Sequence, residues 1–168
     1  GMTAATAVAN QGYQVYLVER EPELGGLLNS IDTIAPEGNA AADVKAELLA
    51  EIAKFDNIKV FTGAKLANVE GYIGNYSVVV EADGKTDEFH ADTIIVATGM
   101  VEIDCAGQYM YGESPDVVTQ LQLEGMLKAG QVKGKKNVVF IQCVNSRNEE
   151  RGCCTVGCSV SVKNARAI

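Results

Sequence analysis

The sequence lacks the features that would place it in a membrane, in a secretory pathway or on nucleic acid. It has no tryptophan and one histidine, and its formal net charge is −8. An acidic chain without a basic stripe binds nucleic acid and anionic membranes poorly. No apolar run approaches the roughly 18 residues that a membrane-spanning helix needs, so no membrane span is predicted. The N-terminus lacks the charged region and cleavage site of a signal peptide, and we therefore expect a cytoplasmic protein.

Acid–base catalysts are also scarce. The single histidine, His90, falls near a predicted hairpin, where a surface role is the simpler interpretation. No arrangement of carboxylates, histidine and hydroxyl or thiol groups is typical of nucleophilic or acid–base catalysis. We therefore predict no catalytic residue of those kinds.

Cysteine is concentrated in one place. Four of the five cysteines, Cys143, Cys153, Cys154 and Cys158, fall in one short segment, and Cys105 stands apart. Clustered thiols in a chain without a secretory signal indicate metal binding or redox chemistry rather than disulfides. The spacing C-x9-C-C-x3-C is neither that of a zinc ribbon nor that of a ferredoxin. An iron–sulfur site, a zinc site and free cysteines all stay open on spacing alone, and Cys105 is interpreted as a bystander rather than a redox partner of flavin.

Hydrophobic patterning predicts an α/β fold. Helical spacing and small or apolar faces predict helices over residues 1–11, 40–55 and 119–129. Short apolar runs predict strands over 14–18, 58–61, 93–97 and 137–141, and Asp83-Gly84 predicts a hairpin turn. Helices that alternate with buried strands favour a largely parallel sheet, to which the hairpin adds a small antiparallel layer.

The first part of the chain has the order of a dinucleotide-binding unit. Gly1 opens a helix, a strand follows, and Glu19 closes that strand 18 residues later. In such units a glycine lets the helix pack on the sheet, and an acidic residue about 20 positions on binds the ribose hydroxyls. The first strand of the unit would lie before residue 1. Since the sequence also ends within a helical pattern, we expect a segment cut at both ends; the alternative is that Gly1 is a cloning scar before a true start methionine.

Three pieces of this region resemble the FAD domain of the two-dinucleotide-binding flavoproteins. They are Glu19-Arg20, the adjacent Gly25-Gly26, and Ala97-Thr98-Gly99. The resemblance implies FAD, with Glu19 on the adenosine ribose and the two glycines near the pyrophosphate or the flavin. The cofactor-binding residues that it implies are Gly1, Glu19, Arg20, Gly25, Gly26, Lys65, Leu66, Thr98 and Gly99.

The cysteine segment extends the resemblance to one family. The run from Phe140 to Arg147, Cys154 with Cys158, Lys163-Asn164-Ala165, and the run from Gly71 to Tyr76 together resemble the A subunit of heterodisulfide reductase over essentially the whole chain. The resemblance implies a methanogenesis-related, electron-transfer flavoprotein subunit with FAD and a [4Fe–4S] cluster. It also implies partner subunits of a heterodisulfide reductase-like complex and an electron-donating hydrogenase or dehydrogenase.

The segment departs from the family pattern at two positions. Asn145 stands where the family has glycine, and Ser159 stands where it has its final cysteine. We expect Cys143, Cys154 and Cys158 to be cluster ligands and Cys153 to supply the fourth thiolate, although ligation by Ser159 or loss of the cluster stays open. An NAD(P)H-dependent flavin oxidoreductase without a cluster, and a zinc-binding α/β module without enzymatic activity, are the rival predictions.

The expected organisation follows from these motifs. Residues 1–100 are predicted to form an incomplete Rossmann-like FAD-binding region, and residues 101–135 a connecting region. Residues 136–168 would begin a second dinucleotide-fold half in which the cysteine segment replaces the glycine loop.

Overall fold

The computed structural model describes residues 1–134 and 136–168. The chain divides into two compact units. Unit 1 comprises Gly1–Gly26 and Val44–Gly99, and unit 2 comprises Leu27–Asp43 and Met100–Ile168. None of the helices in the described ranges has the length and apolar character needed to cross a bilayer. The domain boundaries at residues 100 and 135 stay a prediction.

Unit 1 begins with a helix and two parallel strands. Helix α1 (Met2–Ala9) is followed by β1 (Val15–Val18), and β1 pairs in parallel with β2 (Ile58–Phe61). Parallel neighbours need a long connection, and the chain between these two strands contains α2 (Ala41–Ile52). α1 packs on both strands. The predicted order of helix, strand, helix and strand is therefore confirmed.

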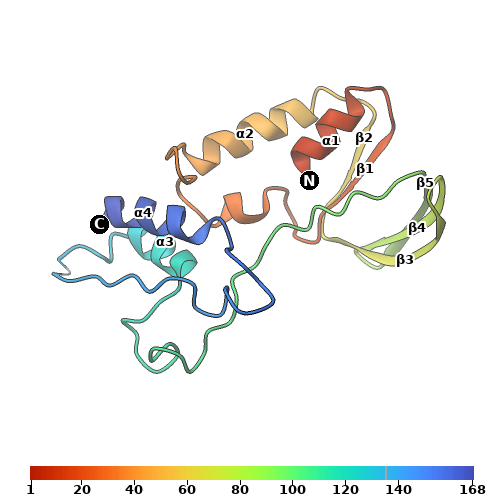
Figure 1. Ribbon diagram of the computed structural model, residues 1–168. Coiled ribbons are helices and arrows are strands. Elements are labelled where there is room, and N and C mark those ends of the chain that lie inside the picture. Colours follow the sequence, from red (N-terminus) through yellow and green to blue (C-terminus); the bar gives the residue numbers. More distant parts are fainter. Residues whose placement is uncertain (135) are drawn as a thin grey trace. The chain divides into compact units, whose positions relative to one another are not determined.

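A three-stranded antiparallel sheet completes unit 1 (Figure 1). Its strands are β3 (Ala64–Tyr72), β4 (Asn75–Ala82) and β5 (Lys85–Ala91), in that spatial order. The turn between β4 and β5 has positive φ at Asp83 (50°) and Gly84 (72°), as a two-residue hairpin of this kind requires. The predicted Asp83-Gly84 hairpin and the α/β class with a small antiparallel layer are confirmed.

The core of unit 1 lies where the two sheets meet. Phe61, Ala64, Val78 and Val80 are buried there. Aromatic rings extend this core, because the Tyr16 ring stacks on the Phe89 ring with centroids 3.9 Å apart. The ends of β1 and β2 are thus fixed against β4 and β5 by apolar contact.

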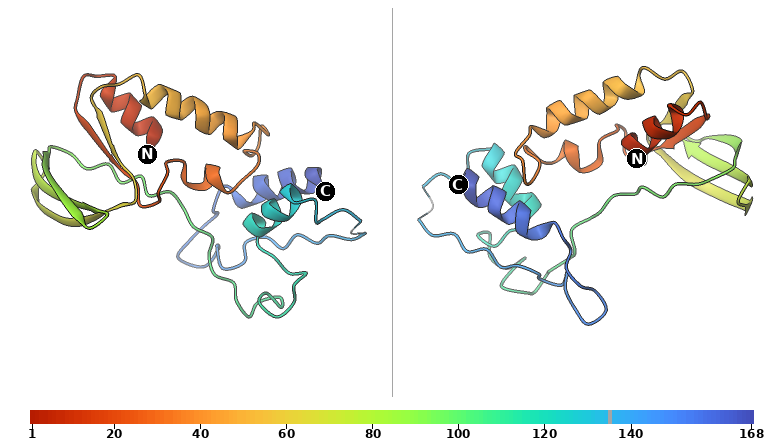
Figure 2. Two further views of the ribbon diagram at one scale, coloured as in Figure 1. Left: turned by 180° about the vertical axis from the view of Figure 1, so that it is seen from behind. Right: turned by 45° about the horizontal axis from the view of Figure 1, so that its top comes forward.

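Unit 2 contains two helices that pack together. Helix α3 (Gln120–Lys128) begins with a reciprocal cap, in which the Thr119 hydroxyl oxygen accepts the Gln122 N–H at 3.2 Å and the Gln122 side chain accepts the Thr119 N–H at 2.8 Å. Helix α4 (Gly157–Ala167) lies beside α3 in both views of Figure 2. The short 3-10 helix η1 (Gly26–Asn29) precedes a loop whose Asp32 and Thr33 contact Glu124 of α3 and Lys163 of α4.

Two sequence predictions about strands differ from the structure. Neither residues 93–97 nor residues 137–141 form a strand among the described residues. Val96 and Val139 are 80% and 81% exposed. An apolar run indicates that a segment prefers burial, but a strand also needs a hydrogen-bonded neighbour, and the described residues supply none for these two segments. Conversely, the sequence analysis missed β3, because all of its residues after Ala64 are exposed and show no alternation.

Candidate functional site

Gly1 lies at the start of α1, against β1 and the stretch that follows β5. A Cβ atom at Gly1 would lie 3.7 Å from Cδ1 of Leu17 and 3.9 Å from the carbonyl oxygen of Ala97. Both are ordinary contact distances, so the helix start packs closely on the strand without requiring glycine there. Ala97 precedes Thr98 in the chain. The structure therefore brings two of the predicted cofactor residues, Gly1 and Thr98, into one neighbourhood.

Glu19 follows β1 and is tied to the start of β3. Its carbonyl oxygen accepts the N–H of Ala64 at 2.9 Å, and its carboxylate accepts the N–H of Glu21 at 3.0 Å. The side chain is half-buried. Because Ala64 precedes Lys65 and Leu66 on β3, the structure places these two predicted residues near Glu19. The carboxylate is held by its own chain and keeps lone pairs free for a ribose hydroxyl.

The two predicted cations are exposed. Arg20 pairs with Glu21, with Nη2 and Oε1 3.0 Å apart, and Lys65 pairs with Glu81 at 3.4 Å. Exposed pairs of this kind contribute about 0–1 kcal/mol, so both cations can exchange partners for an anionic ligand at little cost. Leu66 is 51% exposed and lies at the bulge in β3.

The predicted glycines have backbone conformations that residues with a side chain rarely adopt. Gly25, Gly26 and Gly99 have φ values of 130°, 52° and 73°. A Cβ atom on Gly26 or Gly99 would meet nothing within 4 Å, so the backbone there borders open space. Open glycine backbone can approach phosphate closely. Together with the half-buried Glu19 carboxylate, these residues fit a dinucleotide.

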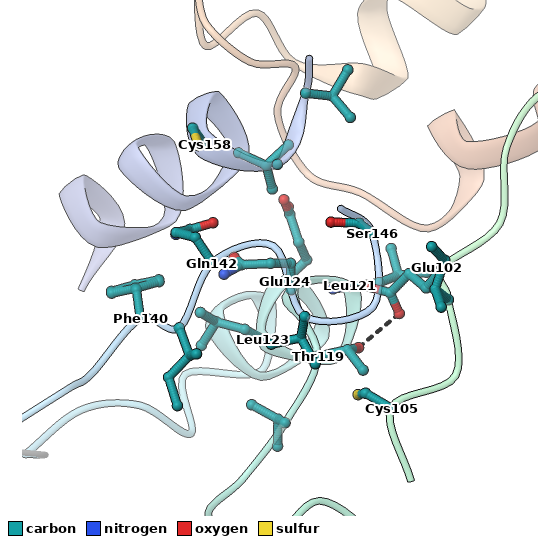
Figure 3. Close-up of a pocket in the computed structure, with 18 of the residues that line it drawn as sticks. Glu102, Cys105, Thr119, Leu121, Leu123, Glu124, Phe140, Gln142, Ser146 and Cys158 are labelled. Carbon is teal, nitrogen blue, oxygen red and sulfur yellow. Dashed lines mark hydrogen bonds between the residues drawn. The ribbon is translucent and has the colours of Figure 1, made fainter. Parts of the chain in front are cut away.

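The cysteine segment lines a cavity within unit 2 (Figure 3). The cavity has a volume of about 980 Å³ and is bordered by all five cysteines: Cys105, Cys143, Cys153, Cys154 and Cys158. Each is a free thiol, and all but the half-buried Cys105 are exposed. The described His, Cys, Asp and Glu side chains include no group of three or more that could hold a metal ion. The structure thus brings the four predicted ligands to one cavity but not into one ligand cage.

Most of the cavity wall is apolar. Side chains from α3 and from the stretch before Cys143 form it: Leu121, Leu123, Val138, Phe140 and Ile141. Four charged residues also border the cavity: Glu102, Asp116, Glu124 and Lys163. The four thiols of residues 143–158 form a donor set that suits soft metals and iron–sulfur clusters. The residues fit such a group in the chemistry of their donors.

Cys154 has the most thiolate-favouring surroundings in the segment. Its sulfur accepts the N–H of Gly157 at 3.4 Å. This bond above all, and then the backbone of Val156, lower the pKa of the Cys154 thiol, and desolvation opposes them. The backbone of Cys154 and the side chain of Ser146 lower the pKa further, with smaller effects than these. The start of α4 therefore favours the ionised form that ligates metals.

A buried ion pair next to the thiols was missed by the sequence analysis. The Lys163 ammonium pairs with the Glu124 carboxylate, and the two side chains are only 10% and 4% exposed. Lys163 Nζ also donates to the carbonyl oxygen of Thr33 at 2.9 Å. The partners lie 39 residues apart in the chain, and no local spacing could have paired them.

The two departures from the family pattern have clear local roles. Asn145 has φ of 52°, a left-handed backbone that asparagine tolerates better than most residues. Its side chain accepts a hydrogen bond from Gln108 at 2.7 Å and donates to the carbonyl oxygen of Asp104 at 3.0 Å. The Ser159 hydroxyl donates to the carbonyl oxygen of Val156 at 2.8 Å, so it is engaged in α4.

Comparisons with known proteins point to one group of relatives. No protein-family model matches the chain. It is 26% identical over 260 aligned positions to the iron-sulfur A subunit of the CoB–CoM heterodisulfide reductase of Methanocaldococcus jannaschii, an alignment that covers 100% of this chain and 40% of that protein. The A subunit of the H(2):CoB-CoM heterodisulfide,ferredoxin reductase of Methanothermobacter marburgensis matches with the same identity and the same coverage.

A third relative is more similar over a shorter stretch. A protein of Archaeoglobus profundus that is described as like the A subunit of heterodisulfide reductase is 40% identical over 80 residues, which are 48% of this chain and 11% of that protein. The chain spans about two fifths of the length of the first two relatives (40% each). The alignment with these relatives spans 260 positions, whereas this chain has 168 residues. The relatives therefore contain residues within the aligned region that this chain lacks.

Among solved structures, the L-proline dehydrogenase from P. horikoshii is 25% identical to this chain. The likeness covers 58% of this chain and 20% of that one, with a TM-score of 0.46. A score of that size is too low to support any conclusion about site or function.

Proposed function

We propose, from the premise that the chain is a protein like the A subunit of heterodisulfide reductase, that it serves in an oxidoreductase as an electron-transfer flavoprotein component. The observation that carries the proposal is the gathering of the free thiols of residues 143–158 on one cavity, within a chain that resembles these subunits along its whole length. Electrons would pass between FAD and a [4Fe–4S] cluster. The protein would be cytoplasmic and work without acid–base catalysis.

Unit 1 would hold FAD. When bound, FAD supplies both one-electron and two-electron redox chemistry. The Glu19 carboxylate would accept hydrogen bonds from the ribose hydroxyls, and the open backbone at Gly26 and Gly99 would approach the pyrophosphate. Arg20 and Lys65, whose present partners are exposed carboxylates, would add positive charge near the phosphates. Gly1, Gly25, Leu66 and Thr98 complete the proposed set.

Unit 2 would hold the cluster through Cys143, Cys153, Cys154 and Cys158. The Ser159 hydroxyl is already engaged with a backbone carbonyl, which favours Cys153 as the fourth ligand. The name of the Methanothermobacter marburgensis relative includes H(2), the CoB–CoM heterodisulfide and ferredoxin. By extension, the partners of this chain would be other subunits of a heterodisulfide reductase-like complex and an electron-donating hydrogenase or dehydrogenase.

A flavin oxidoreductase without a cluster is the second candidate. It is favoured by one observation, namely that the described side chains form no ready-made metal group. This candidate would use NAD(P)H as its reductant, and the cysteine segment would have no metal role. A zinc-binding module without enzymatic activity is the third possibility that an experiment must separate.

The deciding experiment measures bound cofactors on the complete gene product purified without oxygen. Iron, acid-labile sulfide, zinc and flavin are determined per chain for the wild type and for Cys153→Ser and Cys105→Ser. The proposal expects flavin, iron and sulfide in the wild type, loss of the iron of this cluster in Cys153→Ser, and none lost in Cys105→Ser. Flavin without that iron supports the second candidate, and zinc without flavin supports the third.

FAD binding is tested by a second pair of variants. Glu19→Gln removes the charged acceptor for the ribose and is expected to reduce the flavin content after purification. Glu70→Gln, an exposed acidic residue on β3, is the matched control and should leave it unchanged. Equal flavin content in both variants would exclude the proposed role of Glu19.

A further inference from the structure

The loop that follows β1 carries three carboxylates directly before the two adjacent glycines. Glu19, Glu21 and Glu23 alternate along it, and Gly25 and Gly26 come next in the glycine pair. In the proposed function these glycines lie near a pyrophosphate, and an unpaired carboxylate beside them would repel that anion. The partner of each carboxylate therefore affects how the loop can receive a ligand.

Each of the three carboxylates has a partner within unit 1. The Glu19 carboxylate accepts the N–H of Glu21 at 3.0 Å, and the Glu21 carboxylate accepts from Arg20, with Nε and Oε1 3.1 Å apart. The Glu23 carboxylate pairs with the Lys45 ammonium, with Nζ and Oε2 2.9 Å apart. The first two partners are close neighbours in the chain, whereas Lys45 lies on α2, 22 residues from Glu23. The pair of Glu23 and Lys45 therefore ties the loop to another element of the unit.

The loop is also held on either side of Glu23. The carbonyl oxygen of Glu21 accepts the N–H of Gly63, in the turn between β2 and β3, at 2.8 Å. Leu24, the residue before Gly25, is buried. The loop is thus attached at residues 21, 23 and 24, immediately before the glycine pair.

Lys45 is restrained in a way that an ordinary surface lysine is not. Its side chain is 20% exposed, so that most of its stem is covered, and its ammonium group meets a carboxylate at 2.9 Å. Lys54 offers the comparison, because its side chain is 64% exposed and pairs with Glu51, only three residues away. Lys54 contacts the end of its own helix, whereas Lys45 holds a separate segment.

We propose that Lys45 is a positioning residue for the dinucleotide, which holds the glycine loop through Glu23 in the conformation that the ligand meets. The inference rests on the FAD binding of the proposed function and adds a residue that the family resemblance did not supply. A loop that is already ordered loses less conformational entropy when its ligand binds. An anchor of this kind therefore raises the affinity without touching the ligand.

Other roles of Lys45 would make different demands on Glu23. If Lys45 bound the pyrophosphate itself, loss of the Glu23 carboxylate would release the ammonium group, and Glu23→Gln would strengthen binding. If Lys45 only neutralised a repelling charge, Glu23→Gln would leave binding unchanged or stronger. An anchor needs both partners, so loss of either one weakens binding, and exchange of the two charges restores it.

The test measures the dissociation constant of FAD on the flavin-free complete gene product, by the change in flavin fluorescence on binding. Lys45→Met and Glu23→Gln are each expected to raise that constant about threefold to fivefold, which is the range that a partly exposed ion pair supplies. The double variant Glu23→Lys with Lys45→Glu should return it toward the wild-type value. Lys54→Met is the matched control and should leave it unchanged.

Hydrogen exchange of the flavin-free protein shows whether the loop itself is what Lys45 holds. Peptides that cover residues 20–26 are expected to exchange faster in Lys45→Met and in Glu23→Gln than in the wild type. In the charge-exchanged variant they should exchange at the wild-type rate. Peptides that cover β4 are the internal reference and should exchange equally in all variants. If Lys45→Met fails to fold, Glu23→Gln and the charge-exchanged variant still decide.

The outcomes distinguish the inference from the function on which it rests. A wild-type protein that binds no FAD overturns both. FAD binding that Lys45→Met leaves unchanged, or that Glu23→Gln strengthens, overturns the inference and leaves the proposed function intact. Weaker binding with unchanged exchange over residues 20–26 also overturns it, because Lys45 would then act on the ligand directly. Faster exchange over β4 as well overturns it too, since Lys45 would then stabilise unit 1 as a whole.

Discussion

The ammonium group of Lys163 on α4 is paired with the carboxylate of Glu124 on α3, and almost no solvent reaches either side chain. The second carboxylate oxygen of Glu124 accepts the N–H of Asp32 at 3.4 Å, and Lys163 also donates to the carbonyl oxygen of Thr33. The pair therefore joins α3, α4 and the loop that follows η1. It fixes the helix that has Cys158 in its first turn and that begins three residues after Cys154.

Breaking this pair should strongly destabilise unit 2. Lys163→Met leaves a buried carboxylate without its counter-ion, and the expected loss is about 3–5 kcal/mol of the free energy of unfolding. The double variant Lys163→Met with Glu124→Leu should recover much of that loss, because no unpaired charge remains. Denaturant unfolding measures both. Lys54→Met, which breaks an exposed pair with Glu51, should change stability by less than about 1 kcal/mol.

Gly71 should be irreplaceable in the first hairpin of the antiparallel sheet. It has φ of 101°, and a Cβ atom there would lie 2.1 Å from the carbonyl oxygen of Asn75. Gly74 in the same hairpin has φ of 90° but open space around it. Gly74→Ala should cost about 1–3 kcal/mol through backbone strain, and Gly71→Ala should exceed it by about 1 kcal/mol or more through overlap. Similar thermal unfolding midpoints for the two variants would contradict this.

The core of unit 1 should be sensitive at Val80. This side chain is 1% exposed and lies in the buried cluster with Phe61 and Val78. Val80→Ala removes two buried methyl groups and leaves a cavity, so a loss of about 2 kcal/mol is expected in denaturant titrations. Val69→Ala on β3 is the matched control, since Val69 is 39% exposed. A control that loses as much stability as Val80→Ala would place the core elsewhere.

The Cys154 thiol should ionise at lower pH in the folded protein than in the unfolded one. The Gly157 N–H and the other donors favour the thiolate, which lowers the pKa of the thiol in the folded state. As pH rises, the thiolate of folded cluster-free protein therefore forms earlier than that of the same residue in urea. Alkylation with iodoacetamide, followed by peptide mass spectrometry, should show a half-maximal rate for Cys154 at the lower pH. Coincident pH profiles in buffer and in urea would contradict the structure at this turn.

The sequence predicted the regular elements best where local signals were strong. The Asp83-Gly84 turn, the amphipathic α2 and the short strand β2 appear where expected, because turn chemistry and apolar periodicity are local properties. The exposed β3 gave no such signal. Residues 93–97 gave a misleading one, since an apolar run does not show whether a neighbouring strand is present to pair with it.

In the candidate site, too, some features could be predicted from the sequence and others could not. The cysteine spacing and the glycines were visible in the sequence, and the structure places the thiols on one cavity. The pairing of Glu124 with Lys163 and the contact of Gly157 with the Cys154 sulfur were not visible, because each depends on how the chain folds back on itself or turns. Which thiols ligate a metal is a prediction that neither the sequence nor the fold tests.

Asn145 has a consequence for how the cysteine segment is ordered. A glycine at this position would leave the unfolded segment more conformations to lose on folding. Asparagine restricts the backbone conformations of the unfolded segment, and its amide hydrogen-bonds the segment to Gln108 and to the carbonyl group of Asp104. Part of the ordering entropy that a metal would otherwise have to offset is thus met by the protein alone. The turn that carries Cys143 is therefore preorganised by the hydrogen bonds of Asn145, before any metal binds.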